Sequence, residues 1–416
     1  MKKILNKKYV RLAILVCFLL VAISYFVVPK IYGLKYNADI NNEEKVVETL
    51  VDPLVPIKVL TTEESIIVTH LETPKPVKAL YISSWVASSL SFRDKIIKII
   101  DETEINSIVI DVKDNTGKVS FLTDNAEIVR INSAENRIRN IKTFLDLLHK
   151  KNIYIIGRIT VFQDPYLAKK IPEQAVKKLS NKNALWQDDK CKRAISRGSE
   201  KTCTYWLDPG SKEVWNYIAN IGDAAYSVGF DELNFDYIRF PADGNLNDVY
   251  YPISEGKVRV DVMTEFSKYL KNHFAGEQNE KIPRPKISAD IFGLATTEIN
   301  DLGIGQMLIP FAENFDYVMP MVYPSHYAPG TYGYKKPATV PYEIVNFSMK
   351  KAVERLKLAN IDSLKLRPWL QDFNLGAIYN KDMVRAQMKA TYDAGLDSWS
   401  LWDPENTYTR DALLIN

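Results

Sequence analysis

The segment ELNFDYIRFP at 232–241 carries a dense set of side chains that could do chemistry. Its polar residues Glu232, Asn234 and Asp236 alternate with apolar residues. Side chains of a β-strand point alternately to its two faces, so these three polar groups share one face. A buried carboxylate is costly without a partner. Glu232 and Asn234 are therefore expected to meet basic or hydrogen-bonding neighbours, such as Arg158 and Arg239, whereas Asp236 ends the strand and is placed to meet a substrate.

A second segment, KISADIFG at 286–293, repeats this pattern, with Ser288 and Asp290 on one face. If the two segments are neighbouring strands, Asp236 and Asp290 face each other at the same opening. Glycoside hydrolysis needs such a pair, in which one carboxyl group protonates the leaving oxygen and the other attacks or activates water. The sequence therefore predicts Asp236 and Asp290 as catalytic residues. If the two carboxyl groups lie about 5 Å apart, retention of the anomeric configuration is predicted; if they lie further apart, inversion is predicted.

Eight strand-like segments, rich in Val, Ile, Tyr and Phe, recur from residue 78 onward with helical segments between them. This alternation indicates repeated β-α units, and eight of them favour a closed (β/α)8 TIM barrel of the α/β class over an open sheet. No GxGxxG or GxxxxGK[ST] motif follows any of these strands, which argues against a nucleotide-binding sheet. The expected strands are 78–85, 107–114, 153–160, 232–240, 286–293, 315–323, 366–373 and 398–404.

Binding residues of such barrels gather where the strands end. The candidates for substrate binding are the polar and aromatic side chains found there: Asp111, Lys113, Arg158, Asn234, Tyr237, Arg239, Tyr323, His326, Gln371, Trp402 and Asp403. Flat aromatic rings beside carboxylates suit the C–H faces of sugars, although any single Trp could equally pack in the barrel. Two carboxylates have simple structural alternatives, since Asp111 could cap a turn and Asp403 could close an Asx-turn.

The N-terminus resembles a targeting segment, with a basic cluster in MKKILNKKYVR and an apolar run from 12 to 28. A run of this length suits a short membrane-spanning helix, and the basic flank should stay in the cytoplasm. Residues 1–29 are therefore expected to anchor the chain, 30–76 to form an extracytoplasmic stalk, and 77–416 to form the barrel, with a long insertion at about 161–210. The alternative is a cleaved signal and a secreted protein.

Cysteine, histidine and charge content limit the partners. Cys191 and Cys203 could close a disulfide outside the cytoplasm, or remain two free thiols. Two such cysteines and four histidines offer no four-ligand zinc pattern, and no metal or other cofactor is expected. The 54 basic residues nearly balance the 51 acidic ones, so no nucleic-acid partner is expected.

Four segments resemble a known family: INSIVIDVKDNTGKVSF, YIIGRITVFQDPYLA, GFDELNFDYIRFP and FDYVMPMVYPSHYAPGTYG. They are similar to the signatures of the bacterial family described as "Putative glycosyl hydrolase domain", over about residues 77–412. The resemblance implies a (β/α)8 glycosidase-like fold, and Asp236 matches the strand-four aspartate that often serves catalysis in such barrels. Many of these barrels carry a Glu on a later strand, where this chain offers only Glu405, beyond the eighth strand.

These observations lead to one principal hypothesis, a glycoside hydrolase acting on cell-wall or extracellular polysaccharide. Tethering at the outer membrane face would place it beside such polymers. A non-catalytic carbohydrate-binding barrel is the second hypothesis. The third is a structural envelope protein whose barrel mouth binds a polypeptide.

Overall fold

The computed structural model describes residues 66–188, 191, 203–275 and 284–415. The apolar run at 12–28 and most of the expected stalk lie outside the described residues. Within the described ranges, no helix is both long enough and apolar enough to cross a membrane.

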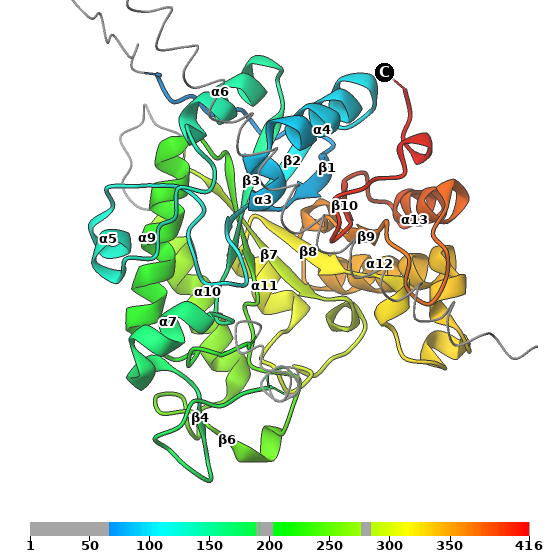
Figure 1. Ribbon diagram of the computed structural model, residues 1–416. Coiled ribbons are helices and arrows are strands. Elements are labelled where there is room, and N and C mark those ends of the chain that lie inside the picture. The colour runs from blue at the N-terminus through cyan, green and yellow to red at the C-terminus, as the bar shows by residue number, and fades with distance from the viewer. Residues whose placement is uncertain (1–65, 189–190, 192–202, 276–283, 416) are drawn as a thin grey trace, which may run out of the picture. The chain divides into compact units, whose positions relative to one another are not determined.

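Eight parallel strands close into a barrel in the order β1-β10-β9-β8-β7-β5-β3-β2 (Figure 1). Each strand lies inside one of the expected ranges, so the predicted eight-stranded barrel is confirmed. The bounds are β1 Lys78–Ile82, β2 Ser107–Lys113, β3 Tyr154–Thr160, β5 Glu232–Asp236, β7 Lys286–Phe292, β8 Tyr317–Met321, β9 Trp369–Gln371 and β10 Trp399–Trp402.

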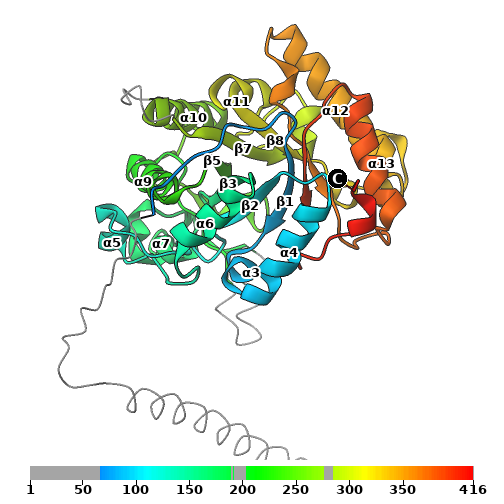
Figure 2. The same cartoon turned by 90° about the horizontal axis from the view of Figure 1, so that it is seen from above.

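Helices surround these strands on the outside, as the view from above shows (Figure 2). Helix α9 shows how the sequence sets their ends: Ser211 Oγ accepts a hydrogen bond from the Val214 amide at its start, and Gly229 takes a left-handed φ of 117° at its end. The bounds are α3 Ser84–Ser88, α4 Leu90–Glu102, α5 Ala126–Ile131, α6 Ile141–Lys150, α7 Pro165–Lys170, α9 Lys212–Val228, α10 Arg259–Ala275, α11 Leu308–Asn314, α12 Pro341–Leu358 and α13 Lys381–Asp393.

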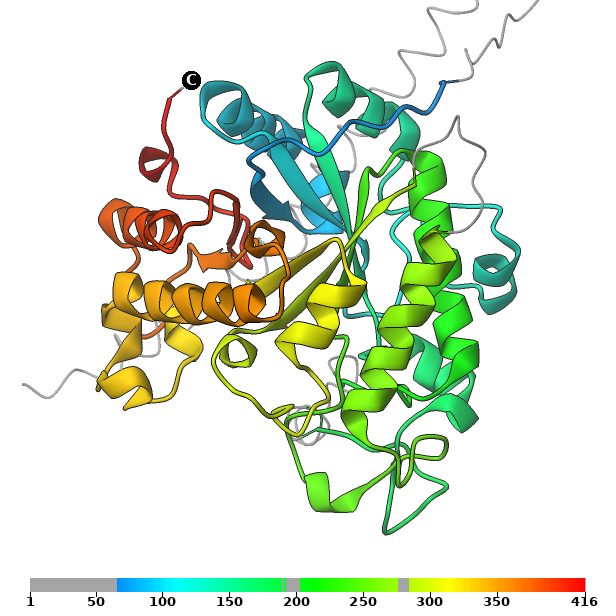
Figure 3. The ribbon, with the colours of Figure 1, turned by 180° about the vertical axis from the view of Figure 1, so that it is seen from behind.

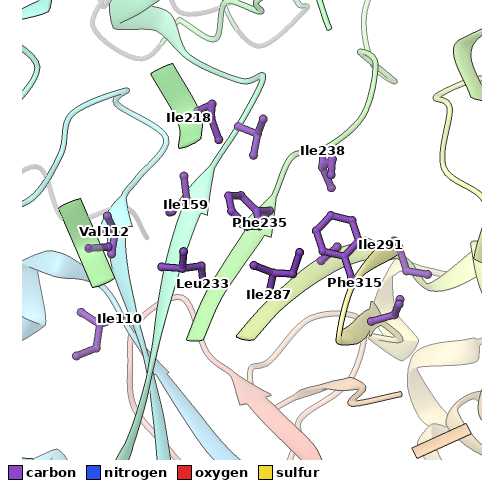
Figure 4. Packing of buried hydrophobic residues seen from close by; sticks show 14 of the residues in the cluster. Ile110, Val112, Ile159, Ile218, Leu233, Phe235, Ile238, Ile287, Ile291 and Phe315 are labelled. Carbon is purple, nitrogen blue, oxygen red and sulfur yellow. The ribbon is translucent and has the colours of Figure 1, made fainter. Parts of the chain in front are cut away.

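The core between strands and helices is built from the apolar residues of the alternating pattern. Figure 4 shows Leu233 and Phe235 of β5 beside Ile159 of β3 and Ile287 of β7, with Ile218 of α9 close by. Because these side chains point outward to the helices, the intervening residues of β5 point into the barrel. The alternation in the sequence therefore sets the face on which the polar residues lie.

The chain makes a long excursion between β3 and β5, which includes the expected insertion at 161–210. There β4, Lys177–Lys178, pairs antiparallel with β6, Val249–Tyr250, which follows β5. Cys191 and Cys203 form a disulfide in this excursion, with their Cα atoms 4.2 Å apart.

Residues 66–76, the described end of the expected stalk, cross one end of the barrel (Figure 3). The Leu71 amide donates a hydrogen bond of 2.7 Å to Asp231 Oδ1, next to the start of β5. The Thr73 hydroxyl lies 3.0 Å from the hydroxyl of Tyr154, the first residue of β3. This segment thus packs over the amino-terminal ends of the strands, opposite the end where active sites of such barrels lie.

Candidate active site

A guanidinium group surrounded by carboxylates lies at the carboxyl end of the barrel. Arg158 of β3 donates from Nη1 to Asp111 Oδ1 at 2.7 Å and from Nε to Asp236 Oδ2 at 3.2 Å. A second, short hydrogen bond joins its Nη2 to the same Asp236 oxygen. Its Nε lies 4.0 Å from Asp290 Oδ2. Three strands, β2, β5 and β7, thus each direct one aspartate to a single arginine on β3.

The two predicted catalytic carboxylates are close together. Since Arg158 Nε is 3.2 Å from Asp236 Oδ2 and 4.0 Å from Asp290 Oδ2, these two oxygens can be no more than about 7.2 Å apart. The paired carboxyl groups of glycosidases are separated by roughly 5 to 9.5 Å. The distance between Asp236 and Asp290 is therefore compatible with a catalytic pair.

Asp290 lies in surroundings that favour its protonated form. It is 2% exposed, and its Oδ1 accepts hydrogen bonds from Asn234 Nδ2 at 2.9 Å and Trp369 Nε1 at 2.8 Å. Burial, and next the charge of Asp236, raise the pKa of Asp290 well above its usual value, against the opposing effect of Arg158. Asp290 is therefore the member of the pair suited to hold a proton.

Asp236 is held in a different way. Its Oδ2 accepts the hydrogen bonds of Arg158, and its Oδ1 accepts the backbone N–H of Tyr237 at 2.6 Å. Asp236 is thus bound by a cation and a backbone amide, whereas Asp290 Oδ1 is bound by two neutral side-chain donors. The two carboxyl groups share Arg158, and Asp290 is the one whose pKa is raised.

Both carboxyl groups open onto a cavity of about 400 Å³, within the size range of small-molecule sites. Most of its wall is aromatic or apolar, as suits a sugar ring. The lining residues are Arg158, Asp236, Tyr237, Arg239, Asp290, Phe292, Gly293, Leu294, Met321, Tyr323, His326, Tyr327, Trp369 and Trp402.

A tight turn after β5 brings two of these residues to the cavity. Tyr237 has φ 53°, in the left-handed region that a residue with a side chain seldom adopts. Beyond it, Arg239 comes back to the cavity wall, where its Nη1 donates to the Phe240 carbonyl at 3.0 Å. The turn therefore sets the positions of both Asp236 and Arg239.

The structure brings most of the predicted site residues to one place. Two of them lie behind the lining and hold it: Asp111 binds Arg158, and Asn234 binds Asp290. The predicted residues that line the cavity itself are Arg158, Asp236, Tyr237, Arg239, Asp290, Tyr323, His326 and Trp402.

Three other predicted binding residues are not among the lining residues. Lys113 Nζ is buried against the Thr160 carbonyl at 2.6 Å and Asp164 at 2.8 Å. Gln371 Oε1 accepts the Ser325 amide at 3.1 Å.

Asp403, the third of them, accepts the Glu405 amide at 2.6 Å, as the Asx-turn alternative expects. Glu232 has a basic neighbour, as expected, but this neighbour is Arg367 at 2.8 Å and not Arg158 or Arg239.

Several lining residues were missed from the sequence. Trp369 was not among the predicted binding residues, yet it donates its indole N–H to Asp290. Its place inside the expected strand 366–373 was the available signal. Gly293, Leu294 and Met321 are apolar residues near strand ends, and nothing in their type indicated a site.

Among the described ranges, no cluster of three or more His, Cys, Asp or Glu side chains could hold a metal ion.

The closed barrel of eight parallel strands surrounded by helices is a (β/α)8 barrel of the glycoside-hydrolase-like kind. The chain belongs to the family described as "Putative glycosyl hydrolase domain", whose model matches residues 79–408. The resemblance found in the sequence motifs is thus confirmed.

Solved structures show the same fold. The glycoside hydrolase domain of PgaB (BpsB) from Bordetella bronchiseptica is 13% identical, covering 82% of this chain and 99% of that one, with a TM-score of 0.56. Alpha-L-fucosidase isoenzyme 2 from Paenibacillus thiaminolyticus is 9% identical, covering 81% of this chain and 48% of that one, with a TM-score of 0.54.

A hypothetical protein from Ruminiclostridium thermocellum is 31% identical over 51% of this chain and 96% of that one, with a TM-score of 0.41. No curated protein matches the chain significantly by sequence.

Proposed function

We propose that this protein is a glycoside hydrolase whose catalytic pair is Asp236 and Asp290. One observation carries the proposal: both carboxyl groups line one cavity and share Arg158, and burial raises the pKa of Asp290 well above its usual value. A carboxyl group that keeps its proton beside a second carboxylate can divide the acid and base roles of glycoside hydrolysis with it.

In this proposal Asp290 is the general acid and protonates the glycosidic oxygen as the bond to the anomeric carbon breaks. Asp236, charged and opposite Arg158, acts on the anomeric carbon as nucleophile or activates the water that attacks it. These two roles for Asp236 are separated by the anomeric configuration of the first product, which NMR reads directly. The aromatic wall of the cavity supports the sugar ring.

The proposed substrate is a cell-wall or extracellular polysaccharide, with the barrel on the extracytoplasmic side of the membrane. The disulfide between Cys191 and Cys203 supports an oxidising compartment. The apolar run at 12–28 supports an anchor, with secretion after cleavage as the alternative. Protease treatment of intact cells should degrade the barrel if it is outside, and should spare it if it is cytoplasmic.

The hydrolase itself is tested with the full chain in detergent, on peptidoglycan and on aminosugar polymers, by release of reducing ends. Asp236→Asn and Asp290→Asn should each lower turnover about 10²–10⁴-fold, the usual contribution of such a group, while glycan binding remains. Asp101→Asn, at an exposed ion pair with Lys151, is the matched control and should leave turnover unchanged. Binding without turnover in the parent chain would support a carbohydrate-binding barrel instead.

A further inference from the structure

Arg239 differs from the other buried arginines of the barrel. The structure describes four arginines with little exposure, Arg137, Arg158, Arg239 and Arg367. Three of them contact at least one carboxylate at 2.8 Å or closer. Arg239 forms no ion pair with any described residue, although it is only 6% exposed. A buried charge without a partner is costly, so its presence calls for an explanation.

The guanidinium of Arg239 sits among aromatic rings. Its Cζ lies 4.7 Å from the ring centre of Trp206, 4.7 Å from that of Phe292 and 5.4 Å from that of Tyr237. Cation–π contacts at these distances stabilise the charge modestly and hold the group in place. None of these contacts is a hydrogen bond to an oxygen acceptor, so they do not supply the acceptors that the N–H donors of a guanidinium need.

The guanidinium of Arg239 is largely without acceptors. Its one described hydrogen bond runs from Nη1 to the Phe240 carbonyl at 3.0 Å, so most of the N–H donors of the guanidinium have no described protein acceptor. Arg239 also lines the cavity that holds Asp236 and Asp290. Burial lowers the pKa of Arg239, and the weaker attraction of Tyr237, Asp236 and Asp243 does not offset it. The surroundings therefore stabilise the positive charge only in part.

From this geometry we infer that Arg239 binds a carboxylate of the substrate, so that the sugar in the cavity is acidic. The inference rests on the proposed function and adds the substrate class to it. A rigid, preformed guanidinium matches the two oxygens of a carboxylate, and the pairing supplies the partner that the protein lacks. Hexuronic acids and sugars with a lactyl ether are two kinds of sugar that carry such a group.

The test compares each acidic sugar with the neutral sugar that lacks the group bearing the carboxylate, using calorimetry on the full chain in detergent at constant ionic strength. Sodium D-glucuronate is paired with D-glucose, and N-acetylmuramic acid with N-acetylglucosamine. At least one acidic sugar should bind about tenfold or more tightly than its neutral partner, as expected for a hydrogen bond to a charged group. The pair that shows the preference identifies the source of the carboxylate.

Variants then assign the preference to this residue. Arg239→Gln should remove the preference by weakening the binding of the acidic sugar far more than that of the neutral one, while Arg239→Lys, which keeps the charge but not the fork, should retain part of it. Arg284→Gln is the matched control, since Arg284 lies just before β7 at the opposite end of the barrel in a partly exposed pair with Asp316. It should keep the full preference.

Three results would overturn the inference: no acidic sugar binds better than its neutral partner, Arg239→Gln weakens both members of a pair equally, or Arg284→Gln abolishes the preference as well. Asp290→Asn separates this inference from the proposed function, because it should stop turnover and keep the acidic preference. If the parent chain prefers acidic sugars but hydrolyses no glycan, the hydrolase proposal fails and the binding inference stands.

Discussion

Two buried clusters of charge occupy the same face of β5 and serve different ends. At the start of the strand, Glu232 is fully buried and binds Arg367 at 2.8 Å and the Tyr154 hydroxyl at 3.1 Å. At its end, Asp236 binds Arg158 beside Asp290 and lines the cavity. The charged groups of the first cluster contact only other protein groups, whereas those of the second line a cavity that a ligand could enter.

The difference lies in depth along the barrel and not in residue type. Each cluster is built around one arginine inside the barrel, which faces one glutamate in the inner cluster and three aspartates in the outer one. The inner one is covered by side chains of neighbouring strands, so its charges only compensate each other. The outer one lies where the strands end and the loops leave a cavity, so its charges can also act on a substrate. An ion pair between an arginine and an acidic residue is therefore structural near the start of β5, and we propose that it takes part in catalysis at the end of β5.

Breaking the inner pair should have the largest effect on stability. Arg367→Met leaves the charge of Glu232 buried without its partner, and we expect the free energy of unfolding to fall by about 3–5 kcal/mol. Urea unfolding measures this. The double change Arg367→Met with Glu232→Leu removes both charges and should recover much of the loss. An equal loss of unfolding free energy in the single and double variants would contradict the view that Arg367 serves to neutralise the buried charge of Glu232.

The outer pair should instead set the pH dependence of activity. The raised pKa of Asp290 means that the general acid carries its proton at pH values below that pKa and loses it above. The value of kcat/KM should therefore fall about tenfold per pH unit as the pH rises above this pKa. A pH profile with its fall near the usual carboxyl value of about 4 would contradict the assignment.

A smaller change should come from the neighbour of this acid. The indole N–H of Trp369 opposes the rise in the pKa of Asp290 by binding its carboxylate at 2.8 Å. Trp369→Phe removes this donor, so the pKa should rise further and the fall in activity should move to higher pH, by about one unit or less. Trp399→Phe, at a buried indole that binds the Tyr392 hydroxyl, is the control and should leave the profile in place.

The sequence predicted the barrel well because its pattern is local. Eight apolar segments separated by helices specify eight strands, and the alternation from Glu232 to Asp236 specifies which residues face inward. The pairing of Asp236 with Asp290 followed from the same argument, since β5 and β7 are neighbours in the barrel.

The contacts that complete the site were not predictable in this way. Arg367 meets Glu232 across 135 positions of sequence, and Trp369 meets Asp290 across 79, and no local pattern records such contacts. Gln371 and Asp403 show the converse, because their place at a strand end does not tell whether a side chain faces the cavity or binds a loop amide.

The left-handed residue Tyr237 has a consequence for how such a protein can change. Only this turn separates Asp236 from Arg239, so the proposed catalytic residue and the proposed sugar-binding residue lie in one short segment. Inserting a residue there would misplace both groups at once, whereas exchanging Arg239 alone would alter the preferred sugar and spare the chemistry. Divergence in substrate should therefore proceed by replacement at position 239, with the length of the turn held fixed.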